Sequence, residues 1–526
     1  MSARIPQGIE ATPPIIAMFE TFGPSYVWFA VTTSMLASFA TLLPATIINV
    51  AIPEVMGSFG LGQDQAQWLA TGFLAAGTVT MLMTSYCIDV IGLRLTFVIA
   101  MTIFLLGSIM GGLAPNQEVL IASRVITGAA AGIISPLAMV INFQIFPVHR
   151  RGFAMGIFGI GTILAPALGP TLGGILIDNF GWRYVFFVAV PFSIITIPLA
   201  MIFMPDRDKT KTDIPKFDWA GFLLASIFLS TLLAALSSGV REGWQSDYII
   251  SLFAVALFSF VLFIWWENTV KNPILELKIF LYGRFLAAAI VTLIVGFGLY
   301  GSTYLLPLFL QTLQGIMPTD SGLLMLPAGL AMAVFFPIAG ALSDRYEPRY
   351  IIICGLLLFA FSSWLMRSVD VNTAYASILV WALIGRIGLA LIFPSLNVAS
   401  LNSLPPSLIS QGSAAINFLR QLGGAFGVNY LSIFLSNRTN NYAHQFNETQ
   451  VMSPATIELL INIQDRMFAQ HFGFIMEFPA SFAFLSSTIL SQASTMAFRE
   501  GFLVIAIVFF VTIIPTWYMR GSRKRP

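Results

Sequence analysis

Long apolar runs separated by short polar segments occupy most of the chain between residues 26 and 519. A bilayer core of about 30 Å requires about 20 mostly apolar residues in a helix, because backbone polar groups find no water there. Fourteen runs meet this requirement, so the pattern predicts an all-α polytopic membrane protein. The runs lie at about 26–48, 68–88, 95–114, 119–142, 152–176, 184–204, 218–238, 247–267, 285–311, 321–343, 350–369, 375–397, 411–434 and 499–519.

The basic residues predict the orientation of these spans, because short cytoplasmic loops collect Lys and Arg. With the N-terminus inside, seventeen Lys and Arg residues fall on the inner side, six on the outer side and three within spans. This asymmetry and the even number of spans predict that both termini are cytoplasmic.

Composition excludes the main soluble classes. Of 526 residues, 57% are hydrophobic and 10% are charged, whereas soluble domains carry about 25% charged residues. A net charge of +2 gives no field that would gather nucleic acid. Two cysteines and three isolated histidines predict neither a disulfide framework nor a metal site. The sequence has no convergent acid–base cluster and no phosphate-binding G-x-x-x-x-G-K-[ST] motif, so we expect neither an enzyme nor a cofactor.

Two short inner loops carry similar charges at matching places along the chain. The loop between 68–88 and 95–114 holds Asp89, Gly92 and Arg94, and the loop after 321–343 holds Asp344 and Arg345. A carboxylate there can face a neighbouring helix end and a guanidinium, with contacts that hold one access state and break in the other. Solvated loop charges are the alternative, and the repetition favours a gate.

Three arginines fall within spans, where a charge is costly unless it faces the protein interior or finds an acceptor. For Arg386 we favour a side chain that reaches toward the interface or pairs with a carbonyl group. Arg124 and Arg420 lie within motifs, so we expect them to contribute to a function inside the membrane.

Small residues recur at every fourth position in the run 152–176 and give one smooth face for close helix packing: Gly161, Ala165, Gly169 and Gly173. Pro166 and Pro170 lie beside this face, and each removes a helical hydrogen bond and bends the chain. The pattern predicts a bendable helix at an interface. A static helix pair would explain the glycines but not the two prolines.

Several of these motifs resemble those of the major facilitator superfamily. The segment from Ala165 to Gly174 resembles the antiporter motif of its drug exporters, and Asp89, Gly92 and Arg94 resemble its loop motif. Arg124, with Gly128 and Gly132, resembles its fourth-helix motif. Three further segments are similar to the fourteen-helix drug:proton antiporter branch of the EmrB/QacA type: Thr46–Pro53, Trp182–Pro191 and Asn417–Gly424.

The resemblance implies a major facilitator fold, with two six-helix bundles, two extra central helices and alternating access. The expected organisation is a cytoplasmic segment 1–25, an N-terminal bundle 26–204, the extra helices with their linkers 205–284, a C-terminal bundle 285–519 and a basic tail 520–526. The C-terminal bundle includes a long outer loop at 435–498. An amphipathic stretch at 453–470 is the expected contact of a periplasmic adaptor, and a plug over the outer cavity is the alternative.

One departure from the family concerns proton coupling. The family places an aspartate in the first span where this chain has Pro44. Of the carboxylates at span ends, Asp178, Glu267 and Glu500, the last matches an acidic position of the family. We hypothesise that coupling uses Asp178 or Glu500 together with Arg124 or Arg420. Pro44 leaves the coupling ion itself open.

The helices that line the cavity in the family supply the candidate substrate contacts of this chain: Asn142, Gln144, Tyr300, Tyr304, Gln311, Gln314 and Asn397. Little fixed negative charge among them favours neutral, zwitterionic or weakly anionic amphiphiles. We expect a multi-pass protein of a bacterial inner membrane that exports lipophilic or amphiphilic compounds by proton antiport, with an adaptor and an outer-membrane duct as possible partners. The alternative is an exporter of one metabolite or lipid, with different or absent proton coupling.

Overall fold

The computed structural model describes residues 13–61, 63–207, 216–449, 458, 461 and 477–519, and within these ranges it contains helices and connecting turns but no β-strand. The first half of the chain forms α1 (Pro13–Phe22), α2 (Tyr26–Phe59), α3 (Gln63–Met81), α4 (Thr84–Ile91), α5 (Leu93–Gly112), α6 (Gln117–Ile145), α7 (Arg151–Phe180), α8 (Tyr184–Phe187) and α9 (Ala189–Phe203). Short 3-10 helices η1 (Gly23–Ser25) and η2 (Val148–Arg150) precede α2 and α7.

The remaining helices are α10 (Trp219–Glu242), α11 (Asp247–Thr269), α12 (Gly283–Thr312), α13 (Pro318–Arg345), α14 (Pro348–Met366), α15 (Tyr375–Leu401), α16 (Ile409–Thr449), α18 (Glu477–Val511) and α19 (Ile513–Trp517). Two more 3-10 helices, η3 (Leu277–Leu281) and η4 (Pro406–Leu408), precede α12 and α16. Side-chain caps satisfy free N–H groups at the start of α6, α10 and α11, through Asn116, Asp218 and Ser246.

Each of the fourteen predicted spans coincides with a long helix or with two consecutive helices. Among the described residues, eleven helices are long and apolar enough to cross a membrane, and twelve if α3 and α4, which are bent by 53°, form one span. The other two predicted spans correspond to α7 and α16, which are 30 and 41 residues long. The structure is therefore consistent with fourteen transmembrane helices.

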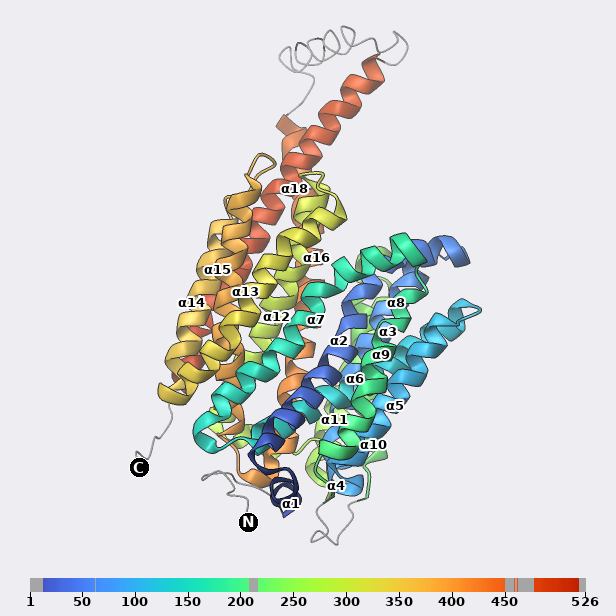
Figure 1. Ribbon diagram of the computed structural model, residues 1–526. Coiled ribbons are helices and arrows are strands. Elements are labelled where there is room, and N and C mark those ends of the chain that lie inside the picture. Colours follow the sequence, from blue (N-terminus) through green and yellow to red (C-terminus); the bar gives the residue numbers. More distant parts are fainter. Residues whose placement is uncertain are drawn as a thin grey trace.

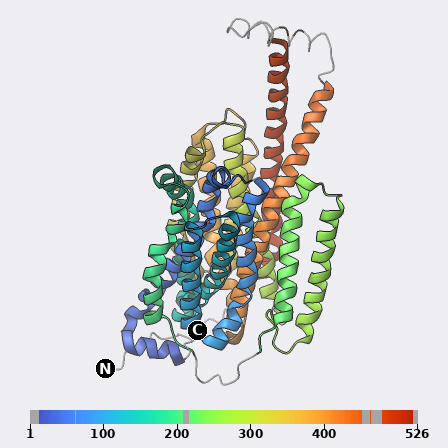
Figure 2. The same cartoon turned by 90° about the vertical axis from the view of Figure 1, so that its right-hand side faces the viewer.

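Helices α16 and α18 extend beyond the other helices at the end of the molecule opposite α1 (Figures 1 and 2). The sequence analysis places an outer loop at 435–498 and begins the last span at 499, whereas α16 continues to Thr449 and α18 begins at Glu477. The length of an apolar run indicates only the part of a helix that lies in lipid. Pro479 falls in the first turn of α18, where proline is tolerated. Apart from residues 458 and 461, the stretch 453–470 lies outside the described residues.

Two groups of helices contact one another near α1 and diverge toward the opposite end (Figure 1). We call the end of the molecule that carries α1 the α1 end. Each group has its own buried apolar core: one is built on α12 to α15 and α18, and the other on α2, α5, α6 and α9. A further core, near the α1 end, includes residues of both groups, such as Phe158 and Val398.

Helices α10 and α11 form an antiparallel pair at one side of the molecule, next to α16 (Figure 2). Helix α10 contacts α3 and α16, whereas α11 contacts mainly α10. Much of α11 is exposed, including Leu257, Phe258 and Val261. An apolar helix with so much exposed surface fits a lipid-facing position, since lipid is as apolar as these side chains.

Candidate functional site

The two groups of helices meet most extensively where α7 packs against α13 near the α1 end. Gly152 and Gly156 of α7 lie so close to α13 that a Cβ on either would collide with a backbone carbonyl oxygen, that of Gly340 or Phe336. Residues without side chains let two helix backbones approach this closely. The contact between the two halves therefore depends on glycine at these positions.

Asp344 adds a polar lock to this contact. Its Oδ1 accepts a hydrogen bond from Gly152 N at 2.7 Å, and its Oδ2 accepts one from Phe153 N at 2.9 Å. Both donors lie in the first turn of α7, where unpaired N–H groups and the helix dipole favour a negative charge. The carboxylate of one half thus caps a helix of the other half. The neighbouring Arg345 is exposed.

The matching loop of the first half has a different arrangement. Gly92 has a φ of +85°, and a Cβ there would meet the backbone of Arg207. Arg94 donates from Nε to the carbonyl oxygen of Met204 at 2.8 Å and pairs with Asp206 at 3.3 Å. These contacts join α5 to the segment after α9 within one half, and Asp89 lies half-buried in α4.

Arg124 is 1% exposed on α6, and backbone carbonyl groups satisfy its charge. Its Nε donates to Leu69 O at 2.9 Å and its Nη2 to Pro44 O at 3.3 Å. The guanidinium also lies over the Phe73 ring, 4.4 Å from the centroid. Pro44 is the residue at which the family resemblance leads us to expect an aspartate, so a neutral carbonyl oxygen meets the arginine in place of the expected carboxylate.

Arg420 on α16 is likewise held by neutral oxygens. Its Nη2 donates to Asn397 Oδ1 at 2.8 Å and its Nη1 to Asn417 Oδ1 at 3.4 Å. Asn417 Oδ1 also accepts from Ser135 of α6 at 3.4 Å, so this network reaches the other half of the chain. Arg386 has a simpler contact, a 3.0 Å hydrogen bond from Nη2 to Thr303 Oγ1.

The small-residue face of α7 packs against α2. A Cβ on Gly169 would collide with Thr46, and Gly161 lies against Met35. Gly173 approaches Ile47, whereas Gly174 has open space at its Cβ position. Ala165 is fully buried, and Pro166 and Pro170 lie inside the same helix. One helix therefore contacts α2 with its later turns and α13 with its first turns.

Asn142 and Tyr300, two of the cavity candidates, are hydrogen-bonded to neighbouring helices. Asn142 is buried and donates from Nδ2 to Ser34 Oγ of α2 at 2.7 Å. Its Oδ1 is buried and receives no hydrogen bond from the described residues. Tyr300 donates its hydroxyl to Gln421 Oε1 at 3.2 Å. Both side chains stabilise contacts between helices of the same half.

The other cavity candidates lie at different levels between the two ends of the molecule. Tyr304 donates to a serine hydroxyl of α16 at 3.3 Å. Gln314 donates to three carbonyl groups of the loop between α14 and α15, and Gln311 is exposed nearby. Gln144 is half-buried near the C-terminal end of α6. These residues do not converge on one described pocket.

The two carboxylates proposed for coupling lie far along their helices from the α1 end. Asp178 is exposed near the end of α7. Glu500 accepts from Tyr442 at 2.7 Å and pairs with Arg438 at 2.9 Å. In this conformation its hydrogen-bonding partners among the described residues are therefore not Arg124 or Arg420.

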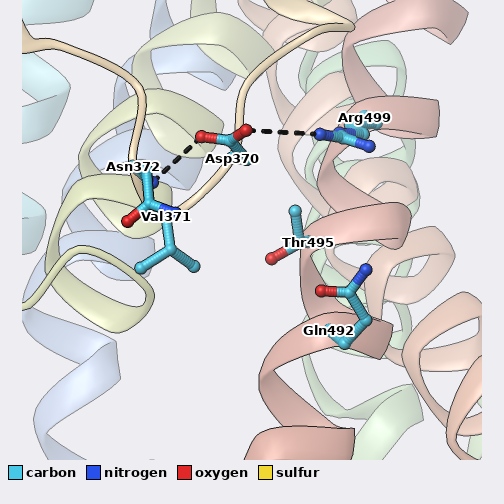
Figure 3. A pocket seen from close by; sticks show the side chains of 6 residues that line it. All are labelled: Asp370, Val371, Asn372, Gln492, Thr495 and Arg499. Atoms are coloured by element: carbon cyan, nitrogen blue, oxygen red, sulfur yellow. Dashed lines mark hydrogen bonds and ion pairs between the residues drawn. The ribbon is translucent and has the colours of Figure 1, made fainter.

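A polar pocket of about 260 Å³ lies between α18 and the loop after α14 (Figure 3). Arg499 donates from Nε to Val369 O at 2.6 Å, and its Nη2 lies 3.9 Å from Asp370 Oδ2. The pocket is lined by Asp370, Val371, Asn372, Gln492, Thr495 and Arg499. All its walls belong to the second half, so it does not lie between the halves. Among the described residues, no cluster of three His, Cys, Asp or Glu side chains could hold a metal ion.

One buried polar cluster was missed by the sequence analysis. Asp218 and Glu267 are 7% and 3% exposed and lie together between α10 and α11. In the sequence, Glu267 lies at a span end and has no identifiable partner. The available signal was an acidic residue at the same end of two consecutive antiparallel helices.

Comparisons with known proteins place these features in a family. A family model described as Major Facilitator Superfamily matches residues 34–428. The chain is 30% identical to the "Uncharacterized MFS-type transporter YhcA" of Bacillus subtilis (strain 168), over 93% of this chain and 92% of the relative. It is 28% identical to the "Probable multidrug resistance protein EmrY" of Escherichia coli (strain K12), over 94% and 95% of the two chains.

Solved structures show the same fold. The human organic anion transporter MFSD10 (TETRAN) aligns with a TM-score of 0.61 and 15% identity, over 94% of this chain and 99% of its own. The proton:xylose symporter XylE aligns with a TM-score of 0.57 and 14% identity, over 93% and 96%. The all-helical fold expected from the sequence is therefore confirmed.

Proposed function

The chain belongs to the Major Facilitator Superfamily, and from this premise we propose that it exports lipophilic or amphiphilic compounds by alternating access and proton antiport. The family and the relatives make it a transporter rather than an enzyme. Its cargo is therefore a small molecule. A relative named as a multidrug resistance protein supports drug-like amphiphiles as that cargo.

The lock formed by Asp344 carries the proposal. The two halves have separate cores, and at the α1 end they are joined by paired glycines and by two hydrogen bonds to one carboxylate. A few polar contacts can break and re-form without exposing either core. Such a bistable contact is what alternating access requires.

Proton coupling in this proposal uses Arg124 or Arg420 with a carboxylate. Arg124 meets the carbonyl oxygen of Pro44 instead of a carboxylate, so its partner would come from another helix when the halves move. Asp178 and Glu500 remain the two candidates. Loss of transport in Asp178→Asn with retention in Glu500→Gln, or the reverse, would assign the role, and an unchanged rate in both would remove the hypothesis.

The charges of the site support a particular cargo chemistry. Arg124 and Arg420 are the positive groups of the site, and neutral carbonyl and amide oxygens hold both. A dication would meet these arginines without a matching carboxylate. Neutral, zwitterionic and weakly anionic amphiphiles are therefore the favoured cargo, and tight transport of a dicationic drug would contradict this point.

We further propose that the α1 end faces the cytoplasm of a bacterial inner membrane, in agreement with the excess of Lys and Arg predicted on that side. The projecting parts of α16 and α18 then lie outside. A helix of 41 residues is about 60 Å long, roughly twice the bilayer core. This projection is the proposed contact for a periplasmic adaptor and an outer-membrane duct.

The first test measures accumulation of neutral and zwitterionic fluorescent amphiphiles in an efflux-deficient bacterium that expresses the protein. Lower accumulation that is restored by a proton ionophore is the expected result. Asp344→Asn and Arg124→Ala should abolish the difference, whereas Arg367→Ala, in the exposed turn after α14, serves as the matched control. Unchanged accumulation for every compound, with the protein present in the membrane, would overturn the multidrug proposal and favour one physiological cargo.

A further inference from the structure

Asp218 and Glu267 bring two buried carboxyl groups together at the α1 end of the extra helices. Asp218 is the N-cap of α10, and Glu267 lies near the C-terminal end of α11. The two side chains are 7% and 3% exposed and interact directly with one another. Because α10 and α11 are antiparallel, these two ends meet.

In each carboxyl group, one oxygen accepts hydrogen bonds. Asp218 Oδ1 accepts from Gly221 N at 2.9 Å and from Trp266 Nε1 at 2.8 Å. Glu267 Oε2 accepts from Leu275 N at 3.0 Å. These bonds fix both groups in place, and they leave one oxygen of each group for a further partner.

The remaining oxygens, Asp218 Oδ2 and Glu267 Oε1, are buried and receive no hydrogen bond from the described N–H and hydroxyl groups. A Cβ on Gly221 would collide with both of them, so they face the same small space. A proton on one carboxyl would let it donate to the other and would satisfy both oxygens.

No described Lys, Arg or His forms an ion pair with Asp218 or Glu267. The titratable groups of the surrounding elements are Tyr86 and Cys87 of α4, Lys216 before α10, Lys271, Glu276 and Lys278 in the link to α12, and Tyr282 after η3. None of them forms a hydrogen bond with either carboxyl among the described contacts. Two buried negative charges side by side are strongly disfavoured.

We propose that Asp218 and Glu267 form a proton-binding site in which the two carboxyl groups share one proton. Its ligand is a proton taken from the aqueous phase at the α1 end. Loss of that proton leaves two carboxylates in apolar surroundings, and their repulsion is relieved by separation of α10 from α11 or by entry of water.

The site is connected to the contact between the two halves. Leu275, whose N–H binds Glu267, belongs to the buried core that includes Phe158 and Val398 from different halves. The next residue, Glu276, donates its backbone N–H to Gln411 Oε1 of α16 at 3.0 Å. Separation of the carboxyl groups would therefore loosen the link that holds α16 and the shared core. This role in transport rests on the proposed function, whereas the binding of the proton does not.

The test is an infrared titration of the purified full-length protein in lipid nanodiscs. A carboxyl group that keeps its proton near neutral pH gives a C=O stretching band distinct from that of carboxylate. We expect this band in the wild-type protein and its loss in both Glu267→Gln and Asp218→Asn. Asp247→Asn, an exposed acid at the opposite end of α11, should retain the band.

Gly221→Ala provides a second variant that removes no ionisable group. Its methyl group would displace both oxygens and should shift or abolish the band, whereas Gly174→Ala, where the Cβ position is open, should leave it unchanged. A neutral-pH band that persists in the double variant D218N/E267Q, or that is missing from the wild-type protein, overturns the proposal. Export assays on the wild-type protein and the same variants separate the two claims. A wild-type protein that shows the band but exports no compound would refute only the proposed function.

Discussion

Asp344 offers the sharpest test of the contact between the halves. Its carboxylate accepts two hydrogen bonds from the first turn of α7, at 2.7 and 2.9 Å. Asp344→Asn retains one acceptor oxygen, so it loses one charge-assisted hydrogen bond, about 1.5–3 kcal/mol. It also loses the favourable interaction of a negative charge with the helix N-terminus, about 0.3–1 kcal/mol. Together these losses amount to about 2–4 kcal/mol, which shifts the ratio of joined to separated states by roughly 30- to 700-fold.

Electron spin resonance can measure this shift as a distance distribution. Spin labels at His149 and Tyr346, both exposed and on opposite sides of the contact, would report its opening after Cys87 and Cys354 are replaced by serine. The wild-type protein should give a short distance, and Asp344→Asn should add a longer one.

Asp320→Asn is the matched control for this measurement, because Asp320 is exposed in the first turn of α13, at the opposite end of that helix from Asp344. It removes one carboxylate from the same pair of elements without touching the lock. A distribution that is the same in Asp344→Asn and in the wild-type protein would refute the reasoning that this carboxylate holds the halves together.

Three further substitutions follow from the same contacts. Arg124→Ala removes two hydrogen bonds to buried carbonyl groups and should lower the free energy of unfolding in detergent by about 3 kcal/mol, whereas Arg386→Ala removes one and should cost about 1 kcal/mol; equal losses would contradict this. Gly340→Ala places a methyl group against the facing carbonyl oxygen and should reduce export roughly tenfold at a normal amount of protein in the membrane. Gly92→Ala should lower the Tm more than Gly181→Ala. Both glycines have a positive φ, so alanine at either position introduces a strain of about 1–2 kcal/mol. A Cβ at Gly92 also meets another backbone segment, whereas the space around Gly181 is open.

The membrane made most of the fold predictable. Lipid fixes the length of an apolar helix, so each of the fourteen runs coincides with a helix or a helix pair. The apolar run does not show where α18 begins, because a helix can continue into polar sequence beyond the lipid. Pro479 lies in the first turn of α18, where a proline breaks no helical hydrogen bond.

The site was less predictable, because its partners are mostly backbone atoms or distant side chains. The cost of burying a charge singled out Arg124, but nothing in the sequence shows that its acceptors are the carbonyl oxygens of Leu69 and Pro44. Asp344 was identified by its repeated position, and the sequence did not distinguish the cap of α7 from the different contacts of Arg94. Spacing alone carries no information on which helix a side chain will face.

Pro44 and the carboxyl pair together suggest a division of roles. A carboxylate beside Arg124 would neutralise it and could also carry a proton, whereas the carbonyl oxygen of Pro44 can accept hydrogen bonds but cannot titrate. Arg124 is thus held in place by a partner that is independent of pH. A proton-driven cycle then binds its proton elsewhere. Besides Asp178 and Glu500, Asp218 and Glu267 offer two adjacent buried carboxyl groups, and no described Lys, Arg or His forms an ion pair with them. Their link through Leu275 reaches the core shared by both halves, which includes Phe158 of α7, the helix that Asp344 caps.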